Sequence, residues 1–225
     1  MRAVVVAAGD LAPADVEHLS GADLVVAADG GASSLDRLDR RPALVVGDFD
    51  SIDEAVARRL GASGTRLRSV PPDKDETDME LAVDAAVEAG ADRIVLLGGL
   101  GGLRIDHAVA NLLLLGDTAL AGRTVEIAHG LTRVRAVRGG DSAVLEAGVG
   151  DIVSLLPIDG DADGVVTEGL RYPLHGERLR FGRARGVSNE VVARPASVAL
   201  ASGALLVFEI RTSPREARDE AADDA

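Results

Sequence analysis

Five aspartates follow short apolar runs in the first third of the sequence: Asp29, Asp48, Asp50, Asp75 and Asp78. In an open parallel sheet the carboxyl ends of the strands form the binding crevice, so side chains at successive strand ends converge on one region. Converging carboxylates need a cation, and Mg²⁺ is usually held by one or two carboxylates together with substrate phosphates. The sequence therefore predicts a site for a hard divalent cation.

Spacing alone favours two of these aspartates as ligands of one ion. Asp48 and Asp50 are separated by one residue, so in an extended segment both side chains point the same way and Phe49 points away. Ordinary turn chemistry also places Asp beside Gly after a strand, and an acid such as Asp78 at a helix start also serves as a cap. Both interpretations remain open for any single aspartate.

Lys74 lies between Asp73 and Asp75 and is the basic residue of this acidic segment. Most surface lysines are solvated charges without a specific role. A lysine beside metal-binding carboxylates, however, can meet a transferring phosphoryl group, where positioning and charge stabilisation account for most of the catalysis. We therefore expect that removing Lys74 lowers turnover more than nucleotide affinity.

Residues 98–102 form a glycine-rich segment between an apolar run and a helical pattern. Such glycines let the backbone approach a phosphate, and the following helix start offers free N–H groups. The segment matches neither the P-loop nor the dinucleotide fingerprint. Arg104 is a candidate for pairing with phosphate, and Asp106 for a ribose hydroxyl or a metal-bound water. His107 is as easily explained by a structural hydrogen bond as by catalysis.

The elements that must position these residues change character along the chain. Up to about residue 130, short β-branched runs alternate with helical patterns, which indicates βαβ units and a parallel sheet. Strands are predicted at residues 3–8, 24–28, 44–47, 66–70, 94–97 and 125–128. Helices are predicted at residues 32–38, 53–60, 78–89 and 106–115. Thr77 and Glu80 form a capping box for the third helix, and Gly90 marks its end.

The second half of the chain has an all-β pattern, with short alternating segments separated by Gly, Asp and Pro. We predict an N-terminal open parallel α/β sheet domain over residues 1–132 and a small C-terminal β-sandwich over residues 133–212. Strands of the sandwich are predicted at residues 133–137, 143–145, 152–156, 165–167, 179–181, 191–192, 197–200 and 204–210. Residues 213–225 read as a disordered acidic tail.

Composition excludes several classes of protein. The formal net charge of −13 argues against nucleic-acid partners, which require clustered Lys and Arg. The chain has no cysteine, hence no disulfide and no thiolate metal site. The first apolar run leads into Gly9 and Asp10 without the features of a signal peptide, and no apolar stretch approaches the roughly 20 residues needed to cross a bilayer. We expect a soluble, cytoplasmic protein with no membrane partner.

Taken in order, six segments resemble the thiamine pyrophosphokinase family, and the resemblance spans about residues 23–210. The segments are Ala28-Asp29-Gly30-Gly31-Ala32, Gly47-Asp48-Phe49-Asp50-Ser51-Ile52, Lys74-Asp75-Glu76-Thr77-Asp78, Arg104-Ile105-Asp106-His107, Gly169-Leu170-Arg171-Tyr172-Pro173-Leu174 and Gly186-Val187-Ser188-Asn189-Glu190. The resemblance implies an α/β domain followed by a β-sandwich. It also implies transfer of the pyrophosphoryl group of ATP to the hydroxyethyl oxygen of thiamine, giving thiamine diphosphate and AMP.

The resemblance also implies roles for individual residues. The residues implied in binding Mg²⁺ or Mg-ATP are Asp29, Asp48, Asp50 and Asp78, with Gly30 beside them and Asp75 in support. The residues implied in contacting nucleotide phosphates or ribose are Lys74, Arg104, Asp106 and His107. Ser188 and Asn189 correspond to the loop that binds the thiamine pyrimidine, across a homodimer interface. Leu103 is an additional residue between Gly102 and Arg104, a departure from the family pattern that bears on Arg104 more than on Asp106.

Three other functions share parts of this pattern. A diphosphokinase acting on another hydroxymethyl heterocycle, such as a pterin, would use the same metal centre with a different acceptor pocket. A noncatalytic nucleotide or thiamine sensor would keep the fold and bind without turnover. A metal-dependent phosphoesterase would direct the same acids at water. The pair Ser188 and Asn189 favours thiamine, and the retained carboxylates with Lys74 favour an enzyme.

Overall fold

The computed structural model of the protein describes residues 1–213, which form two compact units. The first unit comprises residues 1–130, and the second begins at Leu131. Apart from Ser213, the predicted acidic tail lies outside the described residues. The domain limits drawn from the sequence stay predictions.

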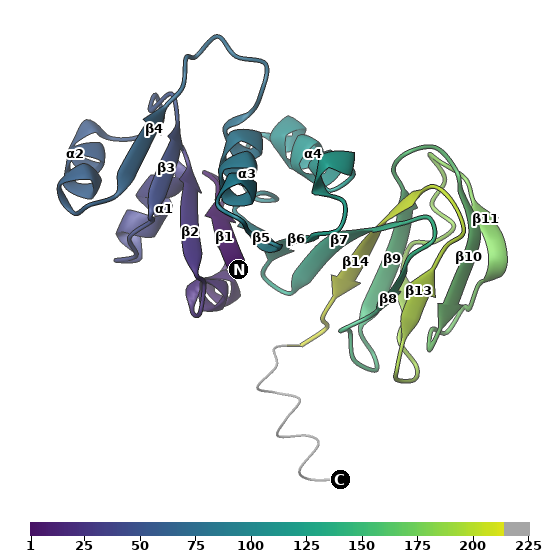
Figure 1. The fold of residues 1–225 in the computed structure, drawn as a ribbon. Coiled ribbons are helices and arrows are strands. Elements are labelled where there is room, and N and C mark those ends of the chain that lie inside the picture. The colour runs from purple at the N-terminus through teal and green to yellow at the C-terminus, as the bar shows by residue number, and fades with distance from the viewer. Residues whose placement is uncertain (214–225) are drawn as a thin grey trace, which may run out of the picture. The chain divides into compact units, whose positions relative to one another are not determined.

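The first unit is built on six parallel strands in the order β6-β5-β1-β2-β3-β4, which can be followed in Figure 1. Their bounds are β1 Arg2–Val6, β2 Leu24–Ala28, β3 Leu44–Gly47, β4 Arg66–Ser69, β5 Arg93–Leu97 and β6 Thr124–His129. The central strands are nearly continuous runs of Val, Ile, Leu and Ala, as expected for parallel strands covered on both faces. In β1, residues 3–6 are completely buried.

Four α-helices alternate with these strands: α1 Gly31–Arg37, α2 Glu54–Ala62, α3 Asp78–Glu88 and α4 Ile105–Leu114. Two short 3₁₀ helices, η1 Pro13–Leu19 and η2 Thr118–Leu120, complete the connections. Helix α3 packs against β1, β2 and β3. It begins with the predicted capping box, in which the Thr77 hydroxyl accepts from the N–H of Glu80 and the Glu80 carboxylate accepts from the N–H of Thr77.

Strand β1 is the point where the direction of the chain reverses. The chain runs outward from β1 through β2 and β3 to β4, returns to place β5 on the other side of β1, and continues to β6. The loops after β1 and β5 therefore leave in opposite directions and open a crevice at the carboxyl ends of these strands, where ligands bind in open α/β sheets. The topology thus directs attention to residues 7–12 and 98–104.

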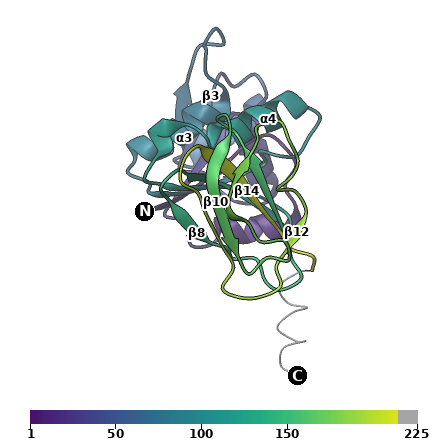
Figure 2. The same ribbon diagram turned by 90° about the vertical axis from the view of Figure 1, so that its right-hand side faces the viewer.

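The second unit contains two antiparallel sheets, with strand orders β12-β9-β14-β7 and β11-β10-β13-β8. Their bounds are β7 Thr132–Arg138, β8 Ser142–Val144, β9 Ile152–Pro157, β10 Ala162–Glu168, β11 His175–Leu179, β12 Asn189–Glu190, β13 Ser197–Ala199 and β14 Ala204–Ile210. Figure 2 turns β8, β10, β12 and β14 toward the reader. Leu155 and Leu205 of one sheet share a buried core with Val165 and Val198 of the other, which makes the unit a β-sandwich.

The predicted fold class, an α/β sheet domain followed by a β-sandwich, is confirmed. Two predicted strands are displaced in the structure. The strand placed at residues 179–181 is β11 and ends at Leu179, because Gly182 adopts a φ of 72° in the turn that follows. The strand placed at residues 191–192 is β12, which covers Asn189 and Glu190 and pairs with β9.

The helices of residues 1–213 are all too short or too polar to cross a membrane.

The packing of α1 against the sheet predicts a large effect of one methyl group. A Cβ at Gly31, the first residue of α1, would lie 1.9 Å from the carbonyl oxygen of Val6. We expect Gly31→Ala to lower the free energy of unfolding by about 3 kcal/mol or more, because the backbone of β1 cannot yield. Chemical denaturation measures this change.

The matched control is Gly61→Ala in α2, where the added Cβ meets only a side-chain carbon of Leu67 at 3.7 Å. This variant should gain about 0.5–1 kcal/mol, because alanine favours a helix over glycine. Equal stability of the two variants would contradict the described packing of α1.

Candidate active site

Three carboxylates meet at the carboxyl edge of the first unit. Asp29 follows β2, Asp48 follows β3, and Asp78 opens α3. Each offers an oxygen, and these oxygens all lie within 4.8 Å of one another. Two strand ends and one helix start therefore converge, which brings together three of the five aspartates that the sequence analysis expected at one point. The oxygens are close enough to bind one hard divalent cation, which takes carboxylate ligands of this kind.

Asp29 is the most buried of the three, with 4% of its surface exposed. Its Oδ1 has no hydrogen-bond partner among the described residues. Burial raises the pKa of Asp29; the polar Ser51 side chain beside it acts in the opposite direction, and repulsion from Asp78, Asp48 and Asp50 adds to the rise. A buried carboxylate oxygen without a donor is costly unless a cation faces it, so the residues present fit a bound metal ion.

Local backbone geometry fixes the position of Asp29. Its N–H donates to the carbonyl of Val46 at 2.8 Å, and its φ of 39° is in the left-handed region. Gly47 lies directly against it, because a Cβ at Gly47 would be 2.8 Å from the Cβ of Asp29. The glycine at the end of β3 therefore makes the space in which the Asp29 side chain lies.

Lys74 supplies the positive charge at this cluster. Its Nζ donates to Asp78 Oδ1 at 2.7 Å and lies 3.9 Å from Asp48 Oδ2, while its side chain is 13% exposed. Burial lowers the pKa of Lys74, but the hydrogen bond to Asp78 and the attraction of Asp78, Asp48 and Asp29 outweigh it, so the pKa is raised overall. The ammonium is therefore charged at neutral pH. Lys74 is also the only lysine in the sequence.

The extended geometry expected for residues 48–50 is wrong. Phe49 has a φ of 64°, so the chain turns there and the Asp48 and Asp50 side chains do not extend in parallel. Within residues 1–213, the cluster of converging carboxylates includes Asp48 but not Asp50. The Asp50 carboxylate is exposed and accepts from the Ser51 hydroxyl at 2.8 Å. Asp75 is exposed and likewise lies outside the cluster.

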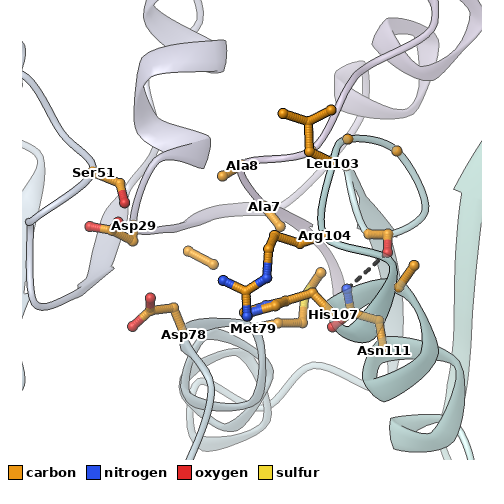
Figure 3. Close-up of a pocket in the computed structure, with 17 residues that line it drawn as sticks. Ala7, Ala8, Asp29, Ser51, Asp78, Met79, Leu103, Arg104, His107 and Asn111 are labelled. Atoms are coloured by element: carbon orange, nitrogen blue, oxygen red, sulfur yellow. Dashed lines mark hydrogen bonds between the residues drawn. The ribbon is translucent and has the colours of Figure 1, made fainter. Parts of the chain in front are cut away.

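A cavity of about 280 Å³ opens beside the carboxylates, in the crevice between the loops that follow β1 and β5. Figure 3 shows Asp29, Ser51 and Asp78 on one side of it and His107 and Asn111 on the other. Much of its wall is backbone of Gly9 and of glycines in residues 98–102. A Cβ at Gly9 would lie 2.2 Å from the carbonyl oxygen of Gly98, so the two loops are too close together for any side chain at Gly9.

Arg104 lines the cavity, but the structure does not place Asp106 there. The Arg104 guanidinium instead forms a two-pronged pair with Asp106, with Nε at 2.9 Å from Oδ1 and Nη2 at 2.7 Å from Oδ2. This hydrogen bond holds the pKa of the Asp106 carboxyl well below its usual range. The preceding Leu103 is fully exposed. In this conformation Asp106 binds Arg104, so the ribose role expected for it has no geometric support here.

Two cavity residues escaped the sequence reasoning. Ser51 lines the cavity beside Asp29. Asn111 of α4 is buried, lines the opposite side, and donates from Nδ2 to the Gly99 carbonyl at 2.9 Å, as the dashed line in Figure 3 marks. The available indication for Asn111 was a single amide in the apolar residues 108–115, where a buried polar side chain requires a partner.

Ser188 and Asn189 belong to the second unit. Ser188 is exposed with a φ of 61°, and its N–H donates to the Ser154 hydroxyl at 3.0 Å. Asn189 begins β12 and lines a separate cavity of about 170 Å³. The other lining residues of this cavity are Leu155, Tyr172, Pro173, Leu174, Arg185, Gly186 and Val187.

Fold and site together define a class: a two-domain chain with an α/β domain that carries a hard-cation site beside a glycine-walled cavity, followed by a β-sandwich. Two family descriptions match its two parts. "Thiamin pyrophosphokinase, catalytic domain" matches residues 16–127, and "Thiamin pyrophosphokinase, vitamin B1 binding domain" matches residues 143–205.

Individual relatives agree with this match. The Caenorhabditis elegans protein Thiamin pyrophosphokinase 1 is 31% identical over 199 residues, covering 82% of this chain and 77% of that protein. Thiamine pyrophosphokinase of Bacillus subtilis is 28% identical over 167 residues, covering 74% of this chain and 78% of that protein. The crystal structure of thiamine pyrophosphokinase from Bacillus subtilis superposes with a TM-score of 0.84 at 25% identity, covering 95% of this chain and 100% of that one. The chain belongs to the thiamine pyrophosphokinase family.

The orphaned oxygen of Asp29 predicts a change in metal affinity. We expect Asp29→Asn to weaken Mn²⁺ or Mg²⁺ binding by about 10-fold or more, because one buried negative ligand is lost. Titration calorimetry measures the affinity without any turnover. The matched control, Asp73→Asn, removes the same charge from an exposed position in the nearby loop and should bind metal like the wild type. Equal losses in both variants would show a general charge effect in place of ligation.

Proposed function

We propose that the protein catalyses ATP-dependent transfer of a pyrophosphoryl group to the hydroxyethyl oxygen of thiamine, giving thiamine diphosphate and AMP. Family membership supports the reaction. The observation that carries the proposal on this chain's own residues is the convergence of Asp29, Asp48 and Asp78 on one point, with Lys74 among them, beside the glycine-walled cavity.

The three carboxylates would hold Mg²⁺ on the side of the cavity where Asp29 lies. Bound there, Mg²⁺ supplies charge neutralisation for the phosphate oxygens of ATP. The rigidity of the strand ends matters, because Mg²⁺ demands a defined oxygen geometry. Asp50 and Asp75 stay proposed as supporting acids on the family resemblance alone.

Lys74 is proposed to stabilise the negative charge that develops during transfer. Every other cationic side chain of the 24 Lys and Arg residues is arginine. A lysine is a compact point charge on a flexible stem, whereas arginine presents a broad planar fork, so the two are not interchangeable in a crowded carboxylate cluster. The single lysine at this position indicates a need for the smaller cation.

The glycine-walled cavity is proposed to take the nucleotide. Backbone N–H groups of residues 98–102 and the start of α4 lie where phosphate oxygens can approach. Arg104 and His107 line the same cavity and are proposed as polar contacts. Gly30, the N-cap of α1, follows Asp29 in the chain and stays proposed on the family resemblance. Asp106 is proposed to act through its pair with Arg104, which sets the direction of the guanidinium.

The chemical step needs one nucleophile and one leaving group. The thiamine hydroxyl oxygen attacks the β-phosphorus, the bond from that phosphorus to the oxygen bridging to the α-phosphate breaks, and its electron pair leaves on AMP. The hydroxyl proton passes to a nearby carboxylate or to water. A loose transition state requires little deprotonation early, so a strong base is unnecessary. The positive thiazolium of thiamine also suits an acidic protein of net charge −13.

Thiamine is proposed to bind at the 170 Å³ cavity of the second unit, where Asn189 and the neighbouring Ser188 lie. The resemblance further supports a homodimer in which a partner chain supplies this loop to the active site, and a cytoplasmic location stays a prediction from the sequence. Sedimentation of the purified protein at a mass of two chains would support the dimer; a single-chain mass at working concentration would contradict it.

The reaction is tested by incubating the protein with ATP, Mg²⁺ and thiamine and separating the products. AMP and thiamine diphosphate should appear in equal amounts. ADP as the nucleotide product would reject the proposal. Inorganic phosphate formed without thiamine would identify the phosphoesterase, and AMP formed only with a hydroxymethyl pterin would identify the pterin diphosphokinase. A protein that binds both substrates without product would be a sensor.

The compact charge of Lys74 yields a prediction for conservative replacement. We expect Lys74→Arg to lower kcat by about 10²-fold or more while the KM for ATP changes little, because a misplaced cation loses transition-state stabilisation first. Steady-state kinetics measures both constants. Arg68→Lys, an exposed position paired with Glu88, is the reciprocal control and should keep wild-type constants. Near-normal turnover of Lys74→Arg would contradict the proposal that catalysis requires the compact charge of a lysine at this position.

A further inference from the structure

The side chain of Asn189 bonds to main chain through both its oxygen and its nitrogen. Its Oδ1 accepts from the N–H of Tyr172 at 3.0 Å and from the N–H of Glu190 at 2.9 Å. Its Nδ2 donates to the carbonyl of Tyr172 at 2.8 Å. Three of the four hydrogen bonds that an amide can form are thus used within the protein. Both acceptor positions of Oδ1 are occupied, which leaves little capacity for a ligand.

The backbone around Asn189 explains why a side chain makes these bonds. The main chain of Asn189 pairs with Val153 of β9. The residues that follow Asn189 pair with residues 169–172 through main chain. Leu170 forms a bridge with Val191, and the N–H of Arg171 donates to the carbonyl of Glu190 at 2.8 Å. The Asn189 side-chain amide extends this pairing to Tyr172, because the main chain of Asn189 is already paired with β9.

Tyr172 depends on this contact at the wall of the 170 Å³ cavity. Both of its main-chain polar groups bond to the Asn189 side chain. The next residue, Pro173, has no N–H to anchor the segment. The tyrosine side chain itself is exposed. Asn189 therefore joins the main chain of Tyr172 to β12, which pairs with β9.

We infer that Asn189 is a positioning residue, which holds the main chain of Tyr172 and thereby shapes the thiamine cavity, in place of binding the pyrimidine through its own amide. The inference rests on the proposed function for the identity of the ligand. It assigns Asn189 a role different from the direct contact that the family resemblance implied. Acceptor binding should then depend on Asn189 through the order of the Tyr172 segment.

The chemistry of the clamp makes asparagine specific at this position. An aspartate side chain there would keep an acceptor for the two N–H groups, but it would lose the donor and face the Tyr172 carbonyl with a second oxygen. Asn189→Asp is therefore a nearly isosteric change that should release Tyr172, and Asn189→Ala removes the clamp entirely. Arg171→Ala is the matched control, because it deletes the neighbouring exposed pair with Glu190 and leaves the amide contacts in place.

The sequence provides a direct probe of the clamp, since Tyr172 is its only tyrosine and tryptophan is absent. Tyrosine fluorescence anisotropy of the full-length protein reports the mobility of this residue alone. Hydrogen–deuterium exchange of the peptide containing Tyr172 reports the protection of its N–H. Neither measurement requires thiamine, ATP or turnover.

We expect Asn189→Ala to lower the tyrosine anisotropy and to speed exchange at Tyr172 by about 10-fold or more, since one hydrogen bond protects this N–H. Asn189→Asp should change both in the same direction, because its second oxygen repels the Tyr172 carbonyl and displaces the segment. The KM for thiamine should rise by about 10-fold with the KM for ATP unchanged, while Arg171→Ala matches the wild type in every measurement. A higher thiamine KM with unchanged anisotropy and exchange would show direct ligand contact and overturn the inference.

The remaining outcomes are also decisive. If the Asn189→Ala chain fails to fold, Asn189→Asp carries the test. Faster exchange at Tyr172 without any change in thiamine KM would confirm the clamp and overturn its role in substrate binding. If the wild-type protein forms no thiamine diphosphate, the proposed function fails, whereas the anisotropy and exchange results still decide whether Asn189 holds Tyr172.

Discussion

The electrostatic conflict among three carboxylates is the constraint on which the site depends. Asp29, Asp48 and Asp78 repel one another, yet the ends of β2 and β3 and the start of α3 hold their oxygens within 4.8 Å. The energy of that arrangement comes from the buried sheet, whose close-packed and mostly apolar central strands resist relaxation at this edge. Lys74 offsets part of the repulsion. The stability of the fold therefore holds like charges close together, and such an arrangement favours the binding of cations and of phosphates that carry them.

Topology places the second half of the binding surface. Because β5 returns to the side of β1 opposite β2, the loops after β1 and β5 diverge and leave the crevice that glycines line. A side chain at Gly9 would collide with the backbone of Gly98, so glycine is what lets the two loops lie this close together. An acidic cluster next to a cavity walled by glycines is a combination suited to metal-bound phosphates, because the carboxylates hold the cation and the glycines let phosphate oxygens approach the backbone.

Sequence reasoning succeeded where periodicity and chain topology decide the outcome. The convergence of Asp29, Asp48 and Asp78 followed from their places after two strands and at a helix start, and the cap of α3 followed from the spacing of Thr77 and Glu80. Failures came from features that spacing does not encode: the left-handed φ of Phe49, which separated Asp50 from Asp48, and the tertiary contacts of Ser51 and Asn111. The amide contacts of Asn189 belong to the same class, because they join segments 17 residues apart.

The central proposal is that Asp29, Asp48 and Asp78 form one divalent-cation site, with the Lys74 ammonium beside it to stabilise phosphate charge. A crystal structure of the protein with Mn²⁺ and a nonhydrolysable ATP analogue tests it directly through the anomalous signal of the metal. The account predicts Mn²⁺ within about 2.5 Å of an oxygen of each of the three carboxylates, with Lys74 turned toward phosphate. The account is contradicted if Mn²⁺ binds elsewhere. It is also contradicted if the ATP analogue binds without metal while Lys74 stays bonded to Asp78.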